Sequence, residues 1–407
     1  MSDLSASFGG TPPRLANINP KPLAVALALV VLGAIYLAQT VSAKQAALYV
    51  LGALLGITLY HAAFGFTSAW RVFIADGRGA GLRAQMFMLA IGVLLFFPSL
   101  SAGTLFGHPV VGEVAPVGIS VLIGAFIFGI GMQLGGGCAS GTLYTVGGGS
   151  TRMVVTLIAF IVGSVVGTAH LPFWAALPHL QPISLVQTLG AVPAIVLNLV
   201  VFAAIAALTV LVEKRRHGRL VGNHGQSNTS SWLRGPWPLF VGGALLAILN
   251  FVTLAVSGHP WGITSAFALW GAKAFSAMGI DVASWPVWSS GRNAAALAAP
   301  VSHDGKSVMD IGIVVGAMLA ASLAGRYAPV WRLPPRSLIA AVFGGLLLGY
   351  GARLAYGCNI GAYFSGIVSG SLHGWLWLVS AFLGSVVGTK LRPAFGLAVE
   401  RTKQTGC

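Results

Sequence analysis

The chain has 407 residues, of which 56% are hydrophobic and only 8% are charged, and its formal net charge is +15. A hydrophobic content this high excludes a soluble globular domain and indicates an integral membrane protein. Almost every Lys and Arg lies at the end of an apolar run, as the positive-inside rule produces. The excess of positive charge therefore does not indicate a nucleic-acid-binding surface.

Apolar runs of about 20 residues, long enough to cross a hydrocarbon core as helices, recur along nearly the whole chain. They lack the alternating segments of about ten residues that are typical of a transmembrane β-barrel. The polar start, residues 1–21, is long, and the first apolar run lacks a convincing signal-peptide cleavage site, so we expect that run to remain as a helix. We predict an all-α protein with ten crossings, near 22–40, 46–63, 84–101, 116–135, 152–170, 184–212, 237–257, 308–325, 336–355 and 375–391.

The cationic residues predict the orientation of these crossings. If the crossings alternate in direction, most basic residues fall on one side, which should be the cytoplasm, together with both termini. The exceptions on the opposite side are Lys44, Arg292 and Lys306. The basic groups on the predicted cytoplasmic side are Arg14, Lys21, Arg71, Arg78, Arg83, Arg152, the run 214–219, Arg326, Arg332, Arg336 and the segment 390–403.

A pattern of glycines, a leucine and a cysteine occurs twice in the chain. It reads Gly-x-Gly-x-x-Leu-x-x-Gly-Cys-x-x-Gly and begins at Gly129 and again at Gly349. Residues 163–168 recur letter for letter as 384–389, and the stretch 65–69 (Gly-Phe-Thr-Ser-Ala) resembles 262–266 (Gly-Ile-Thr-Ser-Ala). Five crossings separate the helices before the two cysteines, and an odd number makes the second copy run in the opposite direction. The sequence therefore predicts two inverted repeats.

These features divide the chain into five predicted parts. Residues 1–45 form a tail and the first crossing, 46–212 the first repeat, and 237–395 the second, inverted repeat. Residues 213–236, rich in Gly, Ser, Asn and basic residues, are expected to form a flexible cytoplasmic linker. Residues 396–407 form a cytoplasmic tail.

The two Gly-Cys motifs are predicted to interrupt membrane helices. Glycine costs about 1 kcal/mol relative to alanine inside a helix, so glycine clusters favour unwinding. Unwound backbone at membrane depth is tolerated only inside protein or beside a wet cavity, and the start of the half-helix that follows presents partial positive charge to an anion. In inverted-repeat transporters such breaks meet near the midplane. The candidate substrate-binding residues of the motifs are Gly137, Cys138, Gly141, Gly357, Cys358 and Gly361.

The thiols of Cys138 and Cys358 point to a soft ligand. A thiol is small, polarizable and only a weak hydrogen-bond donor, which suits a sulfur atom better than a hydrated hard anion. Both cysteines are expected to be free, because three cysteines in an apolar chain offer no disulfide framework. The alternative is that both are packing residues. Cys407, in a polar tail, is expected to play no part.

Further polar residues near the motifs are weaker candidates for anion contacts. Gln133 and Arg353 precede the two cysteines, and Tyr144 and Asn359 follow them. Each could donate to an anion or could instead satisfy a broken backbone, and both interpretations stay open. No histidine spacing indicates a metal site, and no nucleotide-binding motif is found, so we expect neither metal nor cofactor.

With these paired motifs the chain resembles the YeeE/YedE-type sulfur transporters, over about residues 46–395. The resemblance implies uptake of thiosulfate or a related compound across the bacterial inner membrane, through an hourglass-shaped route in which cysteines relay the anion. That role falls on Cys138 and Cys358. A first motif resembling Arg-Phe-Cys-Phe-Thr in the family is Ala-Phe-Gly-Phe-Thr here, with Gly65 in place of the cysteine. The resemblance also implies a cytosolic sulfur-carrier protein as a possible partner.

Two other functions remain as alternatives. A membrane thiol-disulfide redox protein would need the two cysteines close together and a redox partner, and the chain has no Cys-x-x-Cys pair. A passive aquaporin-like pore would be expected to carry Asn-Pro-Ala motifs, which the sequence lacks. The sequence therefore favours a transporter, not an enzyme, for a small sulfur-containing anion.

Overall fold

A computed structural model describes residues 18–221 and 231–400 of the chain. Within these residues, ten helical segments are long and apolar enough to cross a membrane, which confirms the predicted all-α multi-pass architecture. The long helices are α1 (Pro20–Thr40), α2 (Ala43–His61), α4 (Ala80–Ala102), α5 (Ile119–Gly135), α7 (Thr151–Ala175), α9 (Ala191–His217), α10 (Leu239–Ser257), α13 (Gly305–Leu323), α14 (Pro335–Leu354) and α16 (Leu372–Leu391).

Shorter elements connect the long helices. Two antiparallel pairs of two-residue strands join β1 (Thr104–Leu105) with β2 (His108–Pro109) and β3 (Val117–Gly118) with β4 (His179–Leu180). The short helices are α3 (Phe66–Asp76), α6 (Ala139–Gly147), α8 (Leu185–Leu189), α11 (Thr264–Ala277), α12 (Gly291–Ala298), the π-helix η3 (Asn359–Ser365), α15 (Gly366–Val368) and the 3₁₀ turns Val282–Ser284, Val301–His303 and Arg392–Phe395.

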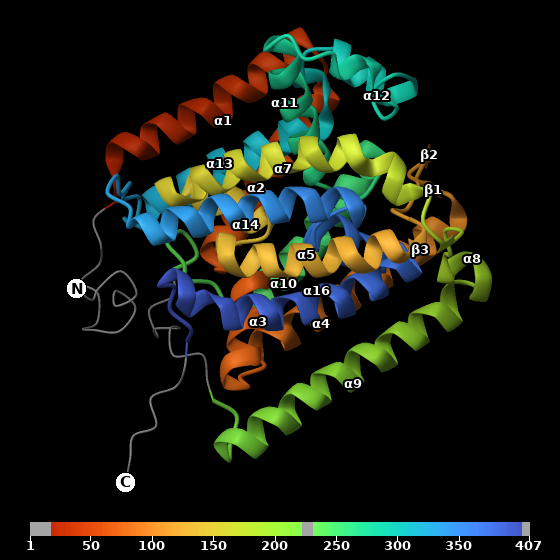
Figure 1. Cartoon of the computed structure of the whole chain (residues 1–407), viewed down its shortest axis with the longest axis vertical. Coiled ribbons are helices and arrows are strands. Elements are labelled where there is room, and N and C mark those ends of the chain that lie inside the picture. The colour runs from red at the N-terminus through yellow and green to blue at the C-terminus, as the bar shows by residue number, and fades with distance from the viewer. Residues whose placement is uncertain (1–17, 222–230, 401–407) are drawn as a thin grey trace.

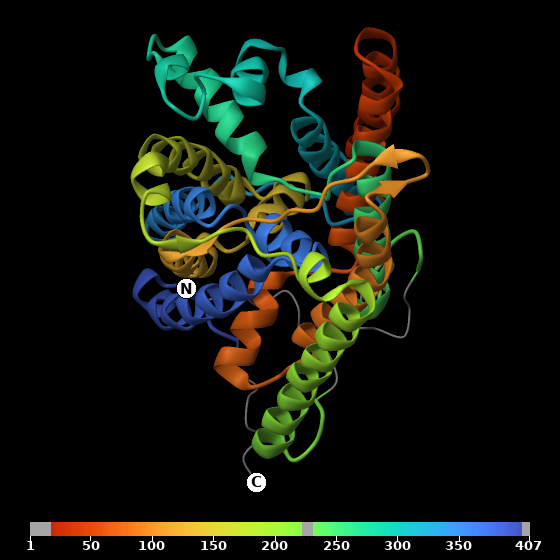
Figure 2. The ribbon, with the colours of Figure 1, turned by 90° about the vertical axis from the view of Figure 1, so that its right-hand side faces the viewer.

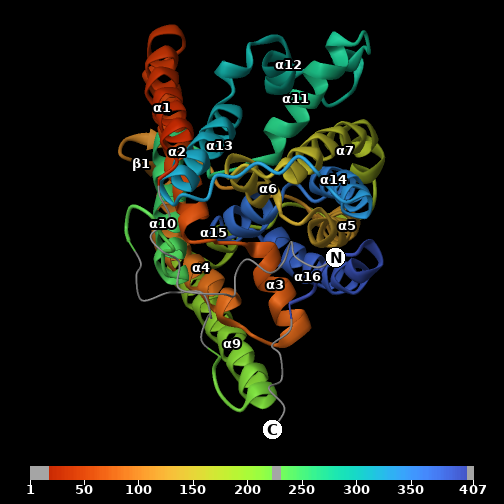
Figure 3. The same cartoon turned by 90° about the vertical axis from the view of Figure 1, so that its left-hand side faces the viewer.

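Eight of the ten long helices, all except α1 and α9, form two layers of four. One layer has the order α7, α14, α5, α16, and the other has the order α13, α2, α10, α4, with neighbours in each order in contact. Figure 3 shows the two layers with α6 and α15 between them, α11 at one edge and α3 at the other. Figure 2 shows α9 (green) at the periphery, on the side away from α11 and α12 (blue-green).

The same contacts confirm the inverted repeat. The matching motifs pair α2 with α10, α3 with α11, α4 with α13, α5 with α14 and α7 with α16. If this pairing is correct, the contact between α7 and α14 should have a counterpart between α16 and α5. The contact between α2 and α13 should likewise have a counterpart between α10 and α4. All of these contacts occur, and α5 and α14, which run in opposite directions, contact each other. An approximate two-fold rotation therefore exchanges the two repeats and maps each layer onto itself.

Glycines allow the helices of each layer to approach closely. A Cβ atom added to Gly349 on α14 would lie 2.1 Å from the carbonyl oxygen of Phe160 on α7. At the related contact, a Cβ on Gly129 of α5 would lie 2.1 Å from the carbonyl oxygen of Ala381 on α16. Small residues at such contacts let membrane helices gain van der Waals packing, which stabilises their association in lipid.

At one end of the bundle, basic side chains form hydrogen bonds and ion pairs with residues near the ends of neighbouring helices. Arg152, at the start of α7, donates to the carbonyl oxygens of Leu134 and Gly135 at the end of α5, at 2.8 and 2.6 Å. Arg83, at the start of α4, forms a 2.7 Å ion pair with Glu213 near the end of α9. We call this the basic end, on the left in Figure 1. It carries Arg71, Arg78, Arg83, Arg152, Arg216 and Arg392.

The sixth crossing differs from the prediction of 184–212. Helix α9 begins at Ala191 because Gly190 adopts φ +85°, a conformation that suits glycine, and separates it from α8. The helix then continues to His217, so residues 213–217 of the expected linker are helical. Cations in a last turn interact favourably with the partial negative charge of a helix C-terminus. Residues 222–230 of that linker lie outside the described residues.

Four interruptions lie at the two pairs of repeated motifs. Two lie at the Gly-Cys motifs, between α5 and α6 and between α14 and η3. The other two lie before α3 and before α11, at the matching Gly-x-Thr-Ser stretches. Helix α6 contacts η3 between the two layers, so the predicted broken helices meet inside the bundle.

Candidate functional site

The two motif cysteines lie at the starts of the half-helices that meet between the layers. Cys138 precedes α6 and Cys358 precedes η3, with exposed fractions of 1% and 0%. The Cys138 sulfur lies 3.4 Å from the Ser140 hydroxyl, and the Cys358 sulfur accepts the Ile360 N–H at 3.4 Å. Both thiols are free, and the half-helices that follow them, α6 and η3, contact each other. The fold therefore brings these repeat-related thiols to one buried region.

Space is left beside one glycine in each motif. A Cβ atom added to Gly361 would meet no atom within 4 Å, and one added to Gly141 would meet only the Cys138 sulfur, at 3.6 Å. By contrast, the glycines directly before the cysteines are crowded, because a Cβ on Gly357 would lie 2.7 Å from the Ala362 nitrogen. Gly141 and Gly361 thus border open space at corresponding positions of the two repeats.

A cavity of about 580 Å³ opens at the end of the bundle opposite the basic end. We call it the large cavity. Its cationic side chains outnumber its carboxylates, which makes the cavity attractive to anions. Three of the cations are the exceptions to the predicted charge distribution. The charged residues that line the cavity are Lys44, Arg292, Lys306 and Arg353, with Glu113 and Asp304.

Arg353 is the cation of this cavity that belongs to a Gly-Cys motif. Within the part of the chain that the structure describes, its guanidinium has no hydrogen-bond or ion-pair partner, and its Nε is buried. An unpaired guanidinium offers several N–H donors in a planar fork, which suits a carboxylate or another oxyanion. The guanidinium of Arg353 is therefore available to an anion in the large cavity.

A smaller cavity of about 140 Å³ lies between α3, α4 and α10. We call it the small cavity. Gly65 and Ser68 line it, and their counterparts in the second repeat, Gly262 and Ser265, line the large cavity. A Cβ atom on Gly65 would lie 2.4 Å from the Ser68 hydroxyl and 3.7 Å from the Tyr144 hydroxyl. Repeat-related residues thus line the two cavities.

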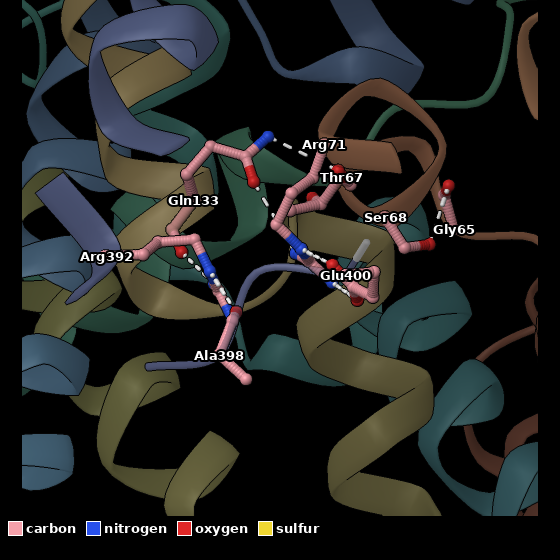
Figure 4. A network of polar contacts seen from close by, with 8 residues as sticks. All are labelled: Gly65, Thr67, Ser68, Arg71, Gln133, Arg392, Ala398 and Glu400. Atoms are coloured by element: carbon pink, nitrogen blue, oxygen red, sulfur yellow. Dashed lines mark hydrogen bonds and ion pairs between the residues drawn. The ribbon is translucent and has the colours of Figure 1, made fainter. Parts of the chain in front are cut away.

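The remaining candidates have different surroundings. Gln133 is fully buried, donates to the Thr67 carbonyl oxygen at 3.2 Å and accepts from Arg71 at 3.5 Å (Figure 4). Tyr144 faces Gly65, as described above. Asn359 is fully buried, and neither atom of its amide group has a hydrogen-bond partner among the described residues. Gln133 therefore stabilises α3 through its bonds to Thr67 and Arg71, whereas the Asn359 amide is free to contact a ligand.

Two polar features of this region were not predicted from the sequence. Asp310, the single acidic residue of its apolar run, is buried on α13, and neither oxygen has a hydrogen-bond partner among residues 18–221 and 231–400. A buried unpaired carboxylate is costly, so this group is expected to be neutral. Arg71, counted only as an orientation charge, pairs with Glu400, which is 329 positions away. No local pattern in the sequence indicated the second feature, because its two partners lie far apart along the chain.

Comparison with known proteins identifies the family of the chain. Residues 61–387 match the family described as sulphur transport. The thiosulfate transporter TsuA of Spirochaeta thermophila is 28% identical over 348 residues, covering 82% of this chain and 94% of that protein. The thiosulfate transporter TsuA of Escherichia coli is 25% identical, covering 82% and 90%. The probable transporter YedE of Escherichia coli is 30% identical over 42% of this chain and 43% of its own length. The chain therefore belongs to the sulphur transport family of membrane proteins and is a transporter, not an enzyme.

Proposed function

We propose that this protein takes up a small sulfur-containing anion, thiosulfate or a related sulfur or selenium compound, along a route lined by Cys138 and Cys358. One observation carries the proposal: two repeat-related thiols are buried together, with open space beside the glycine three positions after each. Two relatives with the printed name thiosulfate transporter support the substrate class. Neither the redox nor the aquaporin-like alternative is favoured by membership of a transporter family.

The anion enters through the large cavity. The positive charge of this cavity raises the local concentration of anions, and Arg353 supplies the first hydrogen bonds. The anion then passes the thiols and Asn359, where the N–H groups at the starts of α6 and η3 offset part of the cost of leaving water. It leaves past Tyr144 toward the small cavity.

Thiols suit this passage because they hold an anion weakly. A neutral S–H group donates a weak hydrogen bond and contacts a soft sulfur atom well. A Lys or Arg at the same buried positions would bind an anion so strongly that release would become slow. Weak donors at both sides of the narrowest region therefore allow rapid passage.

Gly65 affects the choice of substrate. It lines the small cavity at the position where the resembling family motif has a cysteine. With a glycine there, the route offers two thiols in place of three. The protein consequently accepts an anion that needs two successive S–H donors and not three.

The protein lies in the bacterial inner membrane with its basic end and both termini in the cytoplasm. The repeat units are residues 46–212 and 237–395, joined by a linker at 213–236 and flanked by 1–45 and 396–407. A cytosolic sulfur-carrier protein receives the substrate at the basic end. An engineered cysteine at Asn223, outside the described residues, tests the orientation in a variant without Cys407. Labelling of intact cells by an impermeant maleimide would contradict it.

Uptake of radiolabelled thiosulfate, sulfite and selenite tests the function in a strain that lacks its own importers. We expect uptake of at least one of these anions, and we expect the wild type to exceed the double variant Cys138→Ala/Cys358→Ala. Cys407→Ala is the matched control and should behave as wild type. Uptake by the double variant equal to that of wild type, at equal expression, would contradict the proposed role of the thiols.

A further inference from the structure

Two buried guanidinium groups contact Gln133 at the basic end of the bundle. Arg71 on α3 and Arg392 after α16 each have an exposed fraction of 8%. Arg392 donates to the carbonyl oxygen of Gln133 at 2.5 Å and to that of Ala398 at 2.9 Å. The Ala398 contact lies within the segment after α16, and Figure 4 shows Ala398 beside Arg392.

Glu400, at the end of this segment, binds Arg71 through both carboxylate oxygens. The Nε and Nη2 atoms of Arg71 donate to the two oxygens at 2.6 and 2.5 Å. Such a two-point contact matches the planar fork of a guanidinium to a planar pair of oxygens. Sulfur oxyanions present pairs of oxygens with a similar spacing, so the carboxylate has the chemistry of the transported class.

The position of Arg71 relates this pair to the transport route. Its Nη1 donates to the side chain of Gln133 at 3.5 Å, and Gln133 precedes Cys138 by five residues. The residue that precedes Cys358 by five is Arg353, which lines the large cavity and has no partner among the described residues. Each repeat thus holds one guanidinium at this place. One is free, and the other is covered by a carboxylate of the same chain.

We propose that Arg71, braced by Gln133, is an oxyanion-binding site at the basic end of the route, and that Glu400 occupies it as an internal competitor. The inference rests on the proposed function. An anion that reaches the basic end displaces Glu400 from Arg71 before it leaves, and the same carboxylate opposes binding of anions from that side. Export is thereby disfavoured while uptake driven from the other side continues.

The charge state of Glu400 is suitable for this role. Burial raises the pKa of Glu400, but the hydrogen bonds and the charge of Arg71 outweigh it and lower that pKa below the ordinary value. The carboxylate therefore stays ionised at neutral pH and competes across the physiological range. The competing charge of Glu400 is therefore removed by substitution of the residue and not by a lower pH.

Inverted membrane vesicles, in which the basic end faces the bath under the proposed orientation, test the inference. The measurement is the half-saturation concentration for labelled thiosulfate, or for whichever labelled anion the uptake assay identifies. Glu400→Gln keeps the shape of the side chain and removes its charge. Because the ion pair between Arg71 and Glu400 is partly exposed, its contribution is modest, and its loss should lower the half-saturation concentration about three- to fivefold.

Arg71→Lys keeps the positive charge, loses the two-point contact and should raise the half-saturation concentration. The double variant should lose the gain seen with Glu400→Gln, because the competitor acts only through Arg71. Asp281→Asn, an exposed carboxylate in the loop after α11, is the matched control and should leave the value unchanged. Thermal unfolding of each purified variant identifies any that fail to fold.

Equal half-saturation concentrations for wild type and Glu400→Gln would overturn the inference and leave the proposed function intact. A gain that persists in the double variant would also overturn it. A wild-type protein that carries none of the labelled anions across either face would overturn the proposed function, and the inference with it.

Discussion

Replacing Gly361 by alanine tests where the transport route runs. A Cβ atom at this position meets nothing within 4 Å, so the methyl group enters open space without a clash. The change also removes a glycine from a helical segment, which favours the folded state by up to about 1 kcal/mol. If the space is the passage, the methyl group removes about one favourable contact to the anion, worth about 1 to 2 kcal/mol. Uptake should then fall about five- to thirtyfold while stability is kept.

Gly349→Ala is the matched control, because it makes the same chemical change on α14 with the opposite structural effect. Its Cβ atom would lie 2.1 Å from the carbonyl oxygen of Phe160, so α7 and α14 must separate. Overpacking of this kind costs about 1 to 3 kcal/mol, and we expect a lower melting temperature and less protein in the membrane. The assays are anion uptake per molecule and thermal unfolding in detergent. Wild-type uptake by Gly361→Ala would refute the assignment of this space to the passage.

Cys138→Ala and Cys358→Ala should each reduce uptake strongly in a folded, membrane-inserted protein, and serine should rescue only partly, because a hydroxyl holds an anion more strongly and matches sulfur less well. Wild-type uptake by both alanine variants would make the thiols packing residues. Arg353→Gln introduces the residue found at the matching position of the first repeat. It should raise the half-saturation concentration for uptake about tenfold or more, since a hydrogen bond to a charged group contributes about 1.5 kcal/mol or more. An unchanged half-saturation concentration would contradict a contact between Arg353 and the anion. Desolvation, followed by the charge of Lys306, lowers the pKa of His259 below 6.5. The unfolded chain therefore binds more protons than the native protein as the pH falls through 6.5, and native stability should decrease there. Melting curves of His259→Gln between pH 7 and pH 5 should show a smaller decrease than wild type, and an equal decrease would contradict this role.

The sequence by itself determined the membrane architecture and the inverted repeat. Both depend on information that is local or periodic along the chain: the length of apolar runs, the position of basic residues at their ends, and the recurrence of the Gly-Cys motif. The breaks at Cys138 and Cys358 were predictable for the same reason, because clustered glycines disfavour a helix whatever packs around them. The start of α9 was missed by seven residues, since it depends on a single glycine with positive φ.

Only the tertiary structure decided what each polar or small residue meets. Gly349 and Gly361 belong to the two ends of one motif, yet one is pressed against α7 and the other faces open space, because their neighbours come from other helices. Lys44 and Arg292 were unexplained exceptions in the chain and converge on one cavity in the fold. The pair of Arg71 with Glu400 joins positions that are 329 residues apart. Such contacts depend on how helices distant in sequence pack against one another, and no local pattern records that packing.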